Sequence, residues 1–505
     1  MRLAVEIQLK EISFDHPNIH VLSRFLPGFV LNRSIQKVRI CGNIEQLNQM
    51  TDFFQNNTVK CLEVEDFVST AVPNSTIQSF DSLEEFSYVN KHGPLGGTRV
   101  DEVLDALTRH TGLRKITLSH VEIGNAGFNS LNTLLLNPGS NLAAIHLHQQ
   151  VKIGNEGMNI LSRGLSDISV LKELEISDTK QTIESLTTAY IGWQAVLGAL
   201  QRSLSSLELL NVNNDYVGGR DMGVADAISL SLSNALLHHS TTLKTLNLSC
   251  FEGIVTIAGW NSIMQRIGDC ALLENLDLSA NYFADDIIAA LANALVNNRS
   301  LREISLSLIN GVSEAGWSAF SAVLRNPESA LEIIDLSKNS INDEVMHSFS
   351  NALASNTKLK KFNIQGTFSI TSNGFAAFTH LLCNSSSILT TYQSNHIIEE
   401  LWKKNDDDDD DDDREDDQLK ITLPEDLMNL LQLNKENSPN EAARLKIIMT
   451  HFSGHEINMQ PSVRPYAIAW MGRDDNLYRF LRAMPSLLEA VGEKVSSKKR
   501  ARTEE

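Results

Sequence analysis

Leu273-Glu274-Asn275-Leu276-Asp277-Leu278-Ser279-Ala280-Asn281 decides the fold, because the phrase returns as Leu331-Glu332-Ile333-Ile334-Asp335-Leu336-Ser337-Lys338-Asn339. Looser copies of its Leu-x-x-Leu-x-Leu pattern begin at Ile35, Val59, Leu83, Leu113, Leu142, Leu171, Leu207, Leu243, Leu301, Leu359 and Leu389. A phrase that returns roughly every 24 to 36 residues indicates a solenoid, in which each repeat is one structural unit.

Each copy predicts one strand, because its apolar and polar residues alternate as in a strand with one buried face. A turn and an apolar pattern at helical spacing follow, as where Ile341 to Glu344 leads into Val345, Met346, Phe349 and Leu353. Such a small unit cannot bury its apolar faces alone, so neighbouring units must stack and share one core. The sequence therefore predicts an α/β solenoid, a horseshoe with a parallel sheet on its concave side, helices on its convex side and a helical C-terminal cap.

This repeat resembles the ribonuclease-inhibitor type of leucine-rich repeat over about residues 30–400. The asparagine that closes the phrase is clear at Asn281 and Asn339 only, so the resemblance is to a class of repeat. What the class implies is protein binding.

Composition divides the chain into five predicted segments. These are an N-terminal cap (1–34), the repeat solenoid (35–400), an acidic disordered linker (401–418), a helical C-terminal cap segment (419–492) and a basic disordered tail (493–505). The linker is predicted because Asp406 to Asp417 holds eleven acids and one arginine, which repel one another and cannot form a core. The cap is predicted because the last repeat needs a cover and helical patterns begin near Leu423 and at Glu441.

The cap segment also carries a resemblance. Glu441-Ala442-Ala443-Arg444, the stretch from Ala467 to Asp474 and Met484-Pro485-Ser486-Leu487 resemble the C-terminal segment of uncharacterised leucine-rich-repeat proteins of single-celled algae. That resemblance spans repeats and cap, and it implies no particular activity.

Charge and cysteine content limit the classes of partner and the cellular compartments that we expect. Of the net charge of −19, ten charges lie in the run from Asp406 to Asp417, and the moderately acidic remainder argues against nucleic acid or an anionic membrane as a partner. The five cysteines are scattered without a pairable framework, and no apolar run approaches a membrane span. We therefore expect a monomeric chain that is cytoplasmic or nuclear. Lys498, Lys499, Arg500 and Arg502 form a candidate nuclear-import signal or a solubilising tail.

Alternation along each strand also predicts which side chains face the hollow of the horseshoe. They are the second, fourth and sixth residues after the first leucine of each phrase. As protein-binding candidates this rule gives Lys37, Arg39, Glu63, Glu65, Lys115, His146, His148, Glu173, Glu175, Asn211, Asn247, Asp277, Glu303, Asp335 and Lys361. Strands that face solvent are polar in any repeat protein, so the alternative is a merely solvated face.

Chemistry other than binding has little support in the sequence. His146, His148, Glu173 and Glu175 are residue types that bind zinc, but paired histidines and acids on a wet surface are commoner than metal ligands. No Ser/His/Asp or Cys/His arrangement stands at a recognisable spacing. We expect no metal, no cofactor and no enzymatic activity.

Three functional classes follow from the sequence, and the leading one is a non-catalytic protein-interaction scaffold. A horseshoe followed by an acidic tract resembles the Ran GTPase-activating protein in layout, which implies a small-GTPase regulator as an alternative. Leu423-Pro424-Glu425-Asp426-Leu427 is similar to the opening of an F-box, which implies a ubiquitin-ligase substrate adaptor as a further alternative.

Overall fold

The computed structural model describes most of the repeat region and part of the segment after it. The described residues are 11–15, 35–42, 59–66, 77, 80, 82–90, 100–148, 152–177, 180–181, 189–213, 222–251, 255–367, 369–401 and 423–451. They belong to two compact units, Met1–Ser340 (unit 1) and Ile341–Glu505 (unit 2), which we describe separately. The acidic run and the candidate nuclear-import residues Lys498, Lys499, Arg500 and Arg502 lie outside the described residues.

Unit 1 is built on one parallel sheet whose strands follow the order of the chain. Each strand pairs with the strand of the next repeat. The strands are β1 (Glu11–Asp15), β2 (Lys37–Gly42), β3 (Cys61–Asp66), β4 (Glu85–Asn90), β5 (Lys115–Ser119), β6 (Ala144–His148), β8 (Glu173–Ile176), β10 (Leu209–Asn211), β11 (Thr245–Asn247), β12 (Asn275–Asp277), β13 (Glu303–Ser305) and β14 (Ile333–Asp335). Two further short strands, β7 (Lys152–Ile153) and β9 (Lys180–Gln181), pair only with each other. The first strand extends the sheet into the segment predicted as an N-terminal cap.

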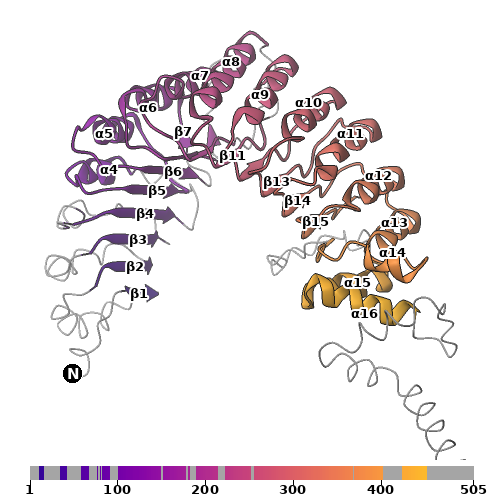
Figure 1. Ribbon diagram of the computed structural model, residues 1–505. Helices are drawn as coiled ribbons and strands as arrows, with labels where there is room; N and C mark the ends of the chain where they lie inside the picture. The colour runs from indigo at the N-terminus through magenta and orange to yellow at the C-terminus, as the bar shows by residue number, and fades with distance from the viewer. Residues whose placement is uncertain are drawn as a thin grey trace, which may run out of the picture. The chain divides into compact units, whose positions relative to one another are not determined.

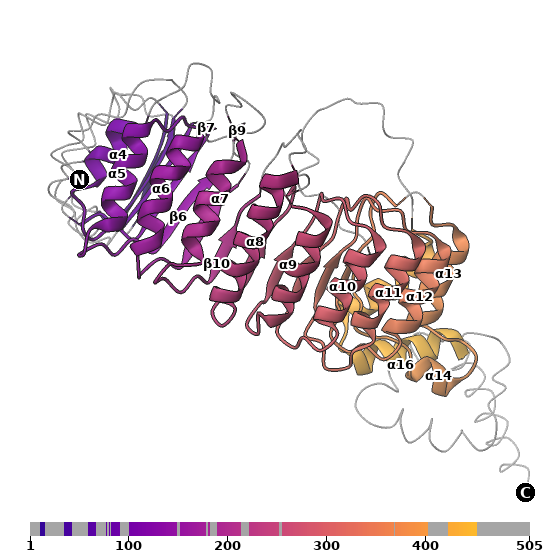
Figure 2. The ribbon, with the colours of Figure 1, turned by 90° about the horizontal axis from the view of Figure 1, so that it is seen from above.

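The helices of unit 1 cover one side of this sheet. Figure 1 shows them on the outer side of a curved, open sheet, and Figure 2 shows them side by side in chain order. They are α4 (Asp101–Leu107), α5 (Asn125–Leu136), α6 (Asn155–Asp167), α7 (Ala189–Leu200), α8 (Met222–His239), α9 (Ile257–Asp269), α10 (Asp285–Leu295) and α11 (Glu314–Arg325). The predicted α/β solenoid with strands inside and helices outside is confirmed for this unit.

The core lies between sheet and helices, and the leucine phrase fills it. Leu273, Leu276 and Leu278 are at most 2% exposed, and the equivalent apolar residues of the second phrase, from Leu331 to Leu336, are buried in the same way. Apolar residues of the helices, such as Trp317 in α11, close the core from the other side. Each repeat thus buries its strand only because a helix and two neighbouring repeats cover it.

The asparagines that close the phrase are buried and fully used. Asn281 donates to the carbonyls of Leu248 (2.9 Å) and Leu278 (2.8 Å) and accepts from the Phe251 N–H at 2.9 Å. Asn339 makes the same three kinds of bond, with the carbonyls of Leu306 and Leu336 and with the Ile309 N–H. The asparagine therefore satisfies backbone groups that a turn in the core would otherwise leave unpaired.

The residue before this position is left-handed in many repeats. Its φ lies between 53° and 56° in His120, Cys250, Ala280, Leu308 and Lys338. In unit 2 the same place is taken by Gly366, with a φ of 70°. The turn that ends these strands therefore demands a positive φ, which costs most residues some free energy and costs glycine none.

In three pairs of successive helices of unit 1, an aspartate near the start of one helix caps the next helix. Asp101 accepts from the N–H of Gly124 at 2.7 Å, Asp226 from the Thr256 hydroxyl at 2.9 Å and Asp285 from the N–H of Ser313 at 2.7 Å. These partners precede the first residues of α5, α9 and α11. Each carboxylate thus meets the positive end of the following helix, where it is favoured.

Unit 2 continues the same strand and helix pattern and corrects one prediction. It contains α12 (Asp343–Leu353), β15 (Lys361–Asn363), α13 (Ser372–Leu382) and α14 (Ile388–Tyr392). The phrase predicted to start a strand at Leu389 is wrong, because α14 occupies it and Leu389 is 63% exposed.

The strand-like segment of that repeat lies further along the chain. Ile398 and Leu401 are fully buried, the N–H groups of Glu399 and Glu400 donate to the Lys360 carbonyl, and the Phe362 N–H donates to the Glu400 carbonyl. The capping box between Ser387 and Thr390 explains the error, since it starts a helix where the leucine spacing alone predicts a strand.

Two helices of the predicted cap segment pack within unit 2. They are α15 (Glu425–Glu436), which contacts α13, and α16 (Pro439–His451), which contacts α14. Leu427, Ala442 and Ile447 are buried in these contacts. Lys446 of α16 is fully buried and donates to the carbonyls of Leu382 (2.8 Å) and Asn395 (3.3 Å).

The rest of the predicted cap segment lies outside the described residues, and so do most of the linker and all of the tail. Within the part of the chain that the structure describes, no helix is long and apolar enough to cross a membrane.

Candidate protein-binding surface

The solvent-facing side chains of the unit 1 strands form the inner face, which is the concave surface of the sheet in Figure 1. All predicted binding residues except Lys361 lie here, and none of them is buried. The register places them in straight rows, since Arg39 pairs with Glu63, His146 with Glu175, Asn211 with Asn247 and Asp277 with Ser305. Sequence alternation therefore identified the correct side of the strands.

The charged residues of β2 and β3 neutralise one another. Lys37 pairs with Glu63 at 3.1 Å and Arg39 pairs with Glu65 at 2.6 Å. The sequence shows a basic strand followed by an acidic strand. In the structure the two strands are neighbours, and their charged side chains form two ion pairs. The described side chains of β2 and β3 thus offer no strongly charged patch to a partner.

His146 is the centre of the densest polar cluster on the inner face. Its Nε2 lies 3.0 Å from Glu173 Oε2, and its Nδ1 lies 3.6 Å from Glu175 Oε2. Glu175 also accepts hydrogen bonds from the Ser177 hydroxyl at 2.9 Å and the Asn211 amide at 3.1 Å. His148 lies on the same strand, but it is not part of this network.

Burial and the nearby Lys115 lower the pKa of His146, although the two carboxylates oppose this shift. The imidazole is therefore neutral at pH 7 and acts as a hydrogen-bonding group. Among the described residues, no three His, Cys, Asp or Glu side chains are arranged to hold a metal ion. The chemistry that this cluster supports is polar recognition.

From β10 to β14 the inner face changes character because the strands end early. Asp277 Oδ1 accepts from the Ser279 N–H at 2.9 Å, and Asp335 Oδ1 accepts from the Ser337 N–H at 2.8 Å. Asn247 bonds the Ser249 N–H in the same way. Such turns compete with strand pairing. They limit β11, β12 and β14 to three residues each, whereas β2 to β4 have six.

Three carboxylates of this region have no cationic partner. Asp277, Glu303 and Asp335 form no ion pair with any described residue, and Glu303 is exposed. The register places Asp277 and Asp335 on either side of Ser305, which lies two residues beyond Glu303 on β13. The part of the inner face formed by β12 to β14 is therefore acidic, and we call these residues the acidic triplet.

Lys361 belongs to unit 2 and is not described with the inner face. It pairs with Glu400 at 3.4 Å, and Lys435 of α15 pairs with the same carboxylate at 2.8 Å. The contact between the repeat and the cap helix thus uses this predicted binding residue.

The sequence of the chain is similar to that of one curated protein. Mouse (Mus musculus) ribonuclease inhibitor is 26% identical over 327 residues, which are 64% of this chain and 66% of that protein. The repeats are leucine-rich repeats of the ribonuclease-inhibitor-like type. The chain matches just under two thirds of the length of this relative, and no protein-family model matches it.

Two solved structures are similar to this chain over most of its length. One is from the crystal structure of the yeast Rad7 and Elc1 complex, with a TM-score of 0.42 and 16% identity, covering 71% of this chain and 86% of that chain. The other is an internalin from Listeria monocytogenes, with a TM-score of 0.32 and 13% identity, covering 72% of this chain and 75% of that chain.

Sequence reasoning missed a second row of charged residues at the start of the strands. The residue directly after the first leucine of each leucine-rich repeat lies at the edge of the sheet. Its N–H donates to the carbonyl of the equivalent residue one repeat earlier, as from Glu208 to Lys172 and from Lys244 to Glu208. This rim row contains Lys60, Glu84, Arg114, Ala143, Lys172, Glu208, Lys244, Glu274, Arg302 and Glu332.

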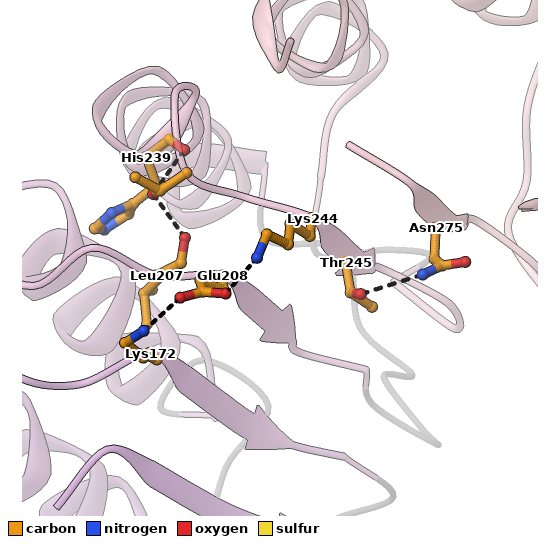
Figure 3. A network of polar contacts seen from close by, with 8 residues as sticks. Lys172, Leu207, Glu208, His239, Lys244, Thr245 and Asn275 are labelled. Carbon is orange, nitrogen blue, oxygen red and sulfur yellow. Dashed lines mark hydrogen bonds and ion pairs between the residues drawn. The ribbon is translucent and has the colours of Figure 1, made fainter. Parts of the chain in front are cut away.

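Figure 3 shows how one acid of the rim row is held. Glu208 lies between Lys172 and Lys244, and each ammonium nitrogen is 2.7 Å from one of its carboxylate oxygens. The two lysines lower the pKa of Glu208 to about 2. The sequence contained the signal for this row, because the charge alternates at the residue directly after the first leucine of most repeats. That position was overlooked because the inner face was selected from the second, fourth and sixth residues.

Proposed function

We propose that this chain is a non-catalytic scaffold that binds a protein partner on the inner face of unit 1. The acidic triplet carries the proposal, since it leaves three carboxylates facing the hollow without a cation among the described residues. The acids of β3, by contrast, pair with cations on β2. Unpaired charge of one sign on a concave polar surface suits a partner of the opposite sign. The partner is accordingly a protein with basic side chains.

The class of repeat supports this proposal. The mouse relative is named for inhibiting a ribonuclease, which is a protein, and its similarity covers the repeats. We further propose that the scaffold is monomeric and needs no cofactor, metal or nucleic acid. Regulation of a small GTPase and adaptor function in a ubiquitin ligase are the alternatives, and the identity of the partner separates them.

The test neutralises the acidic triplet without disturbing its turns. Asp277→Asn and Asp335→Asn keep the oxygens that accept from Ser279 and Ser337, and Glu303→Gln changes an exposed side chain. The matched control is Glu156→Gln, Glu314→Gln and Glu328→Gln, which removes the same charge from exposed positions at outer helices and turns. Reversing Glu173 and Glu175 is less informative, because it also breaks the bonds of His146 and Asn211.

Tagged wild-type protein and both triple variants are compared by affinity purification, mass spectrometry and thermal melting. We expect the acidic-triplet variant to lose the main partner at an unchanged melting temperature and the control variant to keep it. Recovery of Ran or of a Skp-type adaptor as that partner would favour one of the two alternatives. Equal recovery of the partner by all three proteins would place binding elsewhere.

A further inference from the structure

Between Lys60 and Glu332 the rim row of unit 1 alternates in charge with one interruption, and one repeat before Lys60 the equivalent residue, Gln36, is also uncharged. From Lys60 to Glu332 the signs run positive, negative, positive, then an uncharged residue, then positive and negative in turn. The uncharged residue is Ala143, at the place where the alternation requires an acid. Its backbone is in register, because its N–H donates to the Arg114 carbonyl and its carbonyl accepts from the Lys172 N–H, both at 2.8 Å.

The interruption leaves a cation on either side of one row position that carries no charged side chain. Parallel strands lie about 4.8 Å apart, so the backbones of Arg114 and Lys172 are about 10 Å apart. Their side chains are 66% and 60% exposed. The residue beside Ala143 on β6 is also an alanine, Ala144, so neither residue places a charge between the cations.

Both cations keep donors for a further anion. Arg114 uses its Nε towards Glu84 at 3.7 Å, and Lys172 gives one contact to Glu208. A guanidinium has five N–H donors and an ammonium has three. Lys115 adds a third cation on β5, next to Arg114, whereas Glu173 on β8 lies beside His146 at 3.0 Å.

Two other positions of the rim row show which chemical group binds between two flanking cations. Glu208 lies between Lys172 and Lys244 at 2.7 Å from each, and Glu84 lies between Lys60 and Arg114 at 2.6 and 3.7 Å. In both cases the ligand of two flanking cations is a carboxylate. We propose that the row position of Ala143 is a docking site for an acidic side chain of a protein partner, held between Arg114 and Lys172.

This site deepens the proposed function and rests on it, because it adds a second contact at the edge of the same sheet. The partner then presents a glutamate or an aspartate to the start of β6, apart from any basic side chains that it presents to the acidic triplet. The site needs no residue of the acidic triplet, so the two contacts can be tested one at a time.

The experiment titrates the full chain, labelled with ¹⁵N-arginine, with a capped Gly-Glu-Gly peptide at low salt. The Nε–Hε signal of Arg114 is assigned from Arg114→Lys. We expect a saturable shift of this signal with the glutamate peptide and none with a capped Gly-Gln-Gly peptide. Ala143→Glu places a carboxylate at this position and should weaken the peptide at least about fivefold, as expected for two exposed ion pairs.

The matched control is Leu204→Glu, which adds the same charge at a residue that is 71% exposed and outside the rim row. It should leave the peptide shift unchanged. The proposal is overturned if the glutamate peptide does not shift the Arg114 signal, if the glutamine peptide shifts it equally, or if Ala143→Glu binds the peptide as the wild type does. Loss of partner binding in the acidic-triplet variant together with a silent peptide titration would uphold the scaffold and refute this site.

Discussion

Some residues of this protein have structural roles that the leucine pattern does not reveal. The buried asparagines Asn281 and Asn339 are polar residues in an apolar core, yet each bonds at least three backbone groups. A polar side chain that satisfies buried backbone groups stabilises the fold, and its removal leaves those groups unpaired. The asparagines therefore matter for stability even though they contribute no apolar area.

We expect Asn281→Ala and Asn339→Ala each to lower the free energy of unfolding by about 2–4 kcal/mol, because donors and acceptors stay buried without partners. Urea unfolding followed by circular dichroism measures the change. Asn310→Ala, at an exposed neighbouring position, is the control and should have little effect. A loss equal to that of the control would mean that the buried amides are replaced by water at no cost.

Glu208 allows a second test at this scale. Its pKa of about 2 is below the ordinary value near 4.5, so its ion pairs stabilise the fold above pH 4.5, and this stabilisation is lost as the pH falls through about 2. Lys172→Ala or Lys244→Ala should raise the pKa of Glu208, and so should high salt, because exposed pairs are screened. Carbon-13 NMR of the carboxyl group measures it. A pKa near 4.5 in the wild type would show that the lysines do not pair with Glu208 in solution.

At the scale of elements, helix starts are shaped by the aspartates that cap the following helix. Asp285 caps α11, and Gly316 lies in the first turn of α11 directly beside its carboxylate. A Cβ at Gly316 would stand 2.5 Å from Asp285 Oδ1 and 2.7 Å from Val312 Cγ1. This glycine is therefore required for close approach, in contrast to Gly198 in α7, where a Cβ would meet nothing within 4 Å.

Gly316→Ala should therefore destabilise the protein although alanine is the better helix former. Gly198→Ala is the matched change and should stabilise it by about 0.5–1 kcal/mol, the usual helix-propensity difference. Thermal melting of both variants checks the prediction. If the two substitutions moved the melting temperature in the same direction, helix propensity would outweigh the contact with Asp285.

The elements also show how far the sequence could predict the structure. Strands at Leu273 or Leu331 were predictable because three inward apolar residues determine which face is buried. The segment at Leu389 was not, because its spacing also fits one turn of helix and Ser387 caps that helix. Which side chains face the hollow followed from alternation. Their ion pairs did not, because Arg39 meets Glu65 only once the register is fixed.

For the molecule as a whole, a solenoid needs its ends closed, and the segment predicted to close this one contains a buried lysine in unit 2. Lys446 of α16 reaches the end of α13, and its ammonium nitrogen lies 3.2 Å from His396 Nδ1. Burial lowers the pKa of Lys446 to about 7, and burial together with Lys446 lowers the pKa of His396 to about 4. The packing of the predicted cap therefore depends on the protonation of one lysine.

The pKa of Lys446 is about 7 in the folded chain and about 10.5 in the unfolded chain. Between pH 7 and 10.5 Lys446 is therefore protonated in the unfolded chain and largely neutral in the folded chain. The free energy of unfolding consequently increases as the pH rises through this range. We expect the local stability of α16 to increase by about 2 kcal/mol from pH 7 to pH 9. Hydrogen exchange of α16 amides, corrected for intrinsic rates, measures this. Lys446→Met keeps the apolar stem and should remove the increase; an identical pH dependence in this variant would exclude Lys446 as its source.

The alternating rim row has a consequence for how the length of such a chain can change. Removing the single repeat from Leu273 to Ser300 would bring Lys244 next to Arg302, so that like charges meet. Removing two repeats, from Leu273 to Ala330, would bring Lys244 next to Glu332 and restore an attractive pair. The buried asparagines obey the same rule, because Asn281 and Asn339 are two repeats apart. In this part of the chain, repeats can therefore be added or removed in pairs without bringing like charges together, whereas a change by a single repeat brings like charges together.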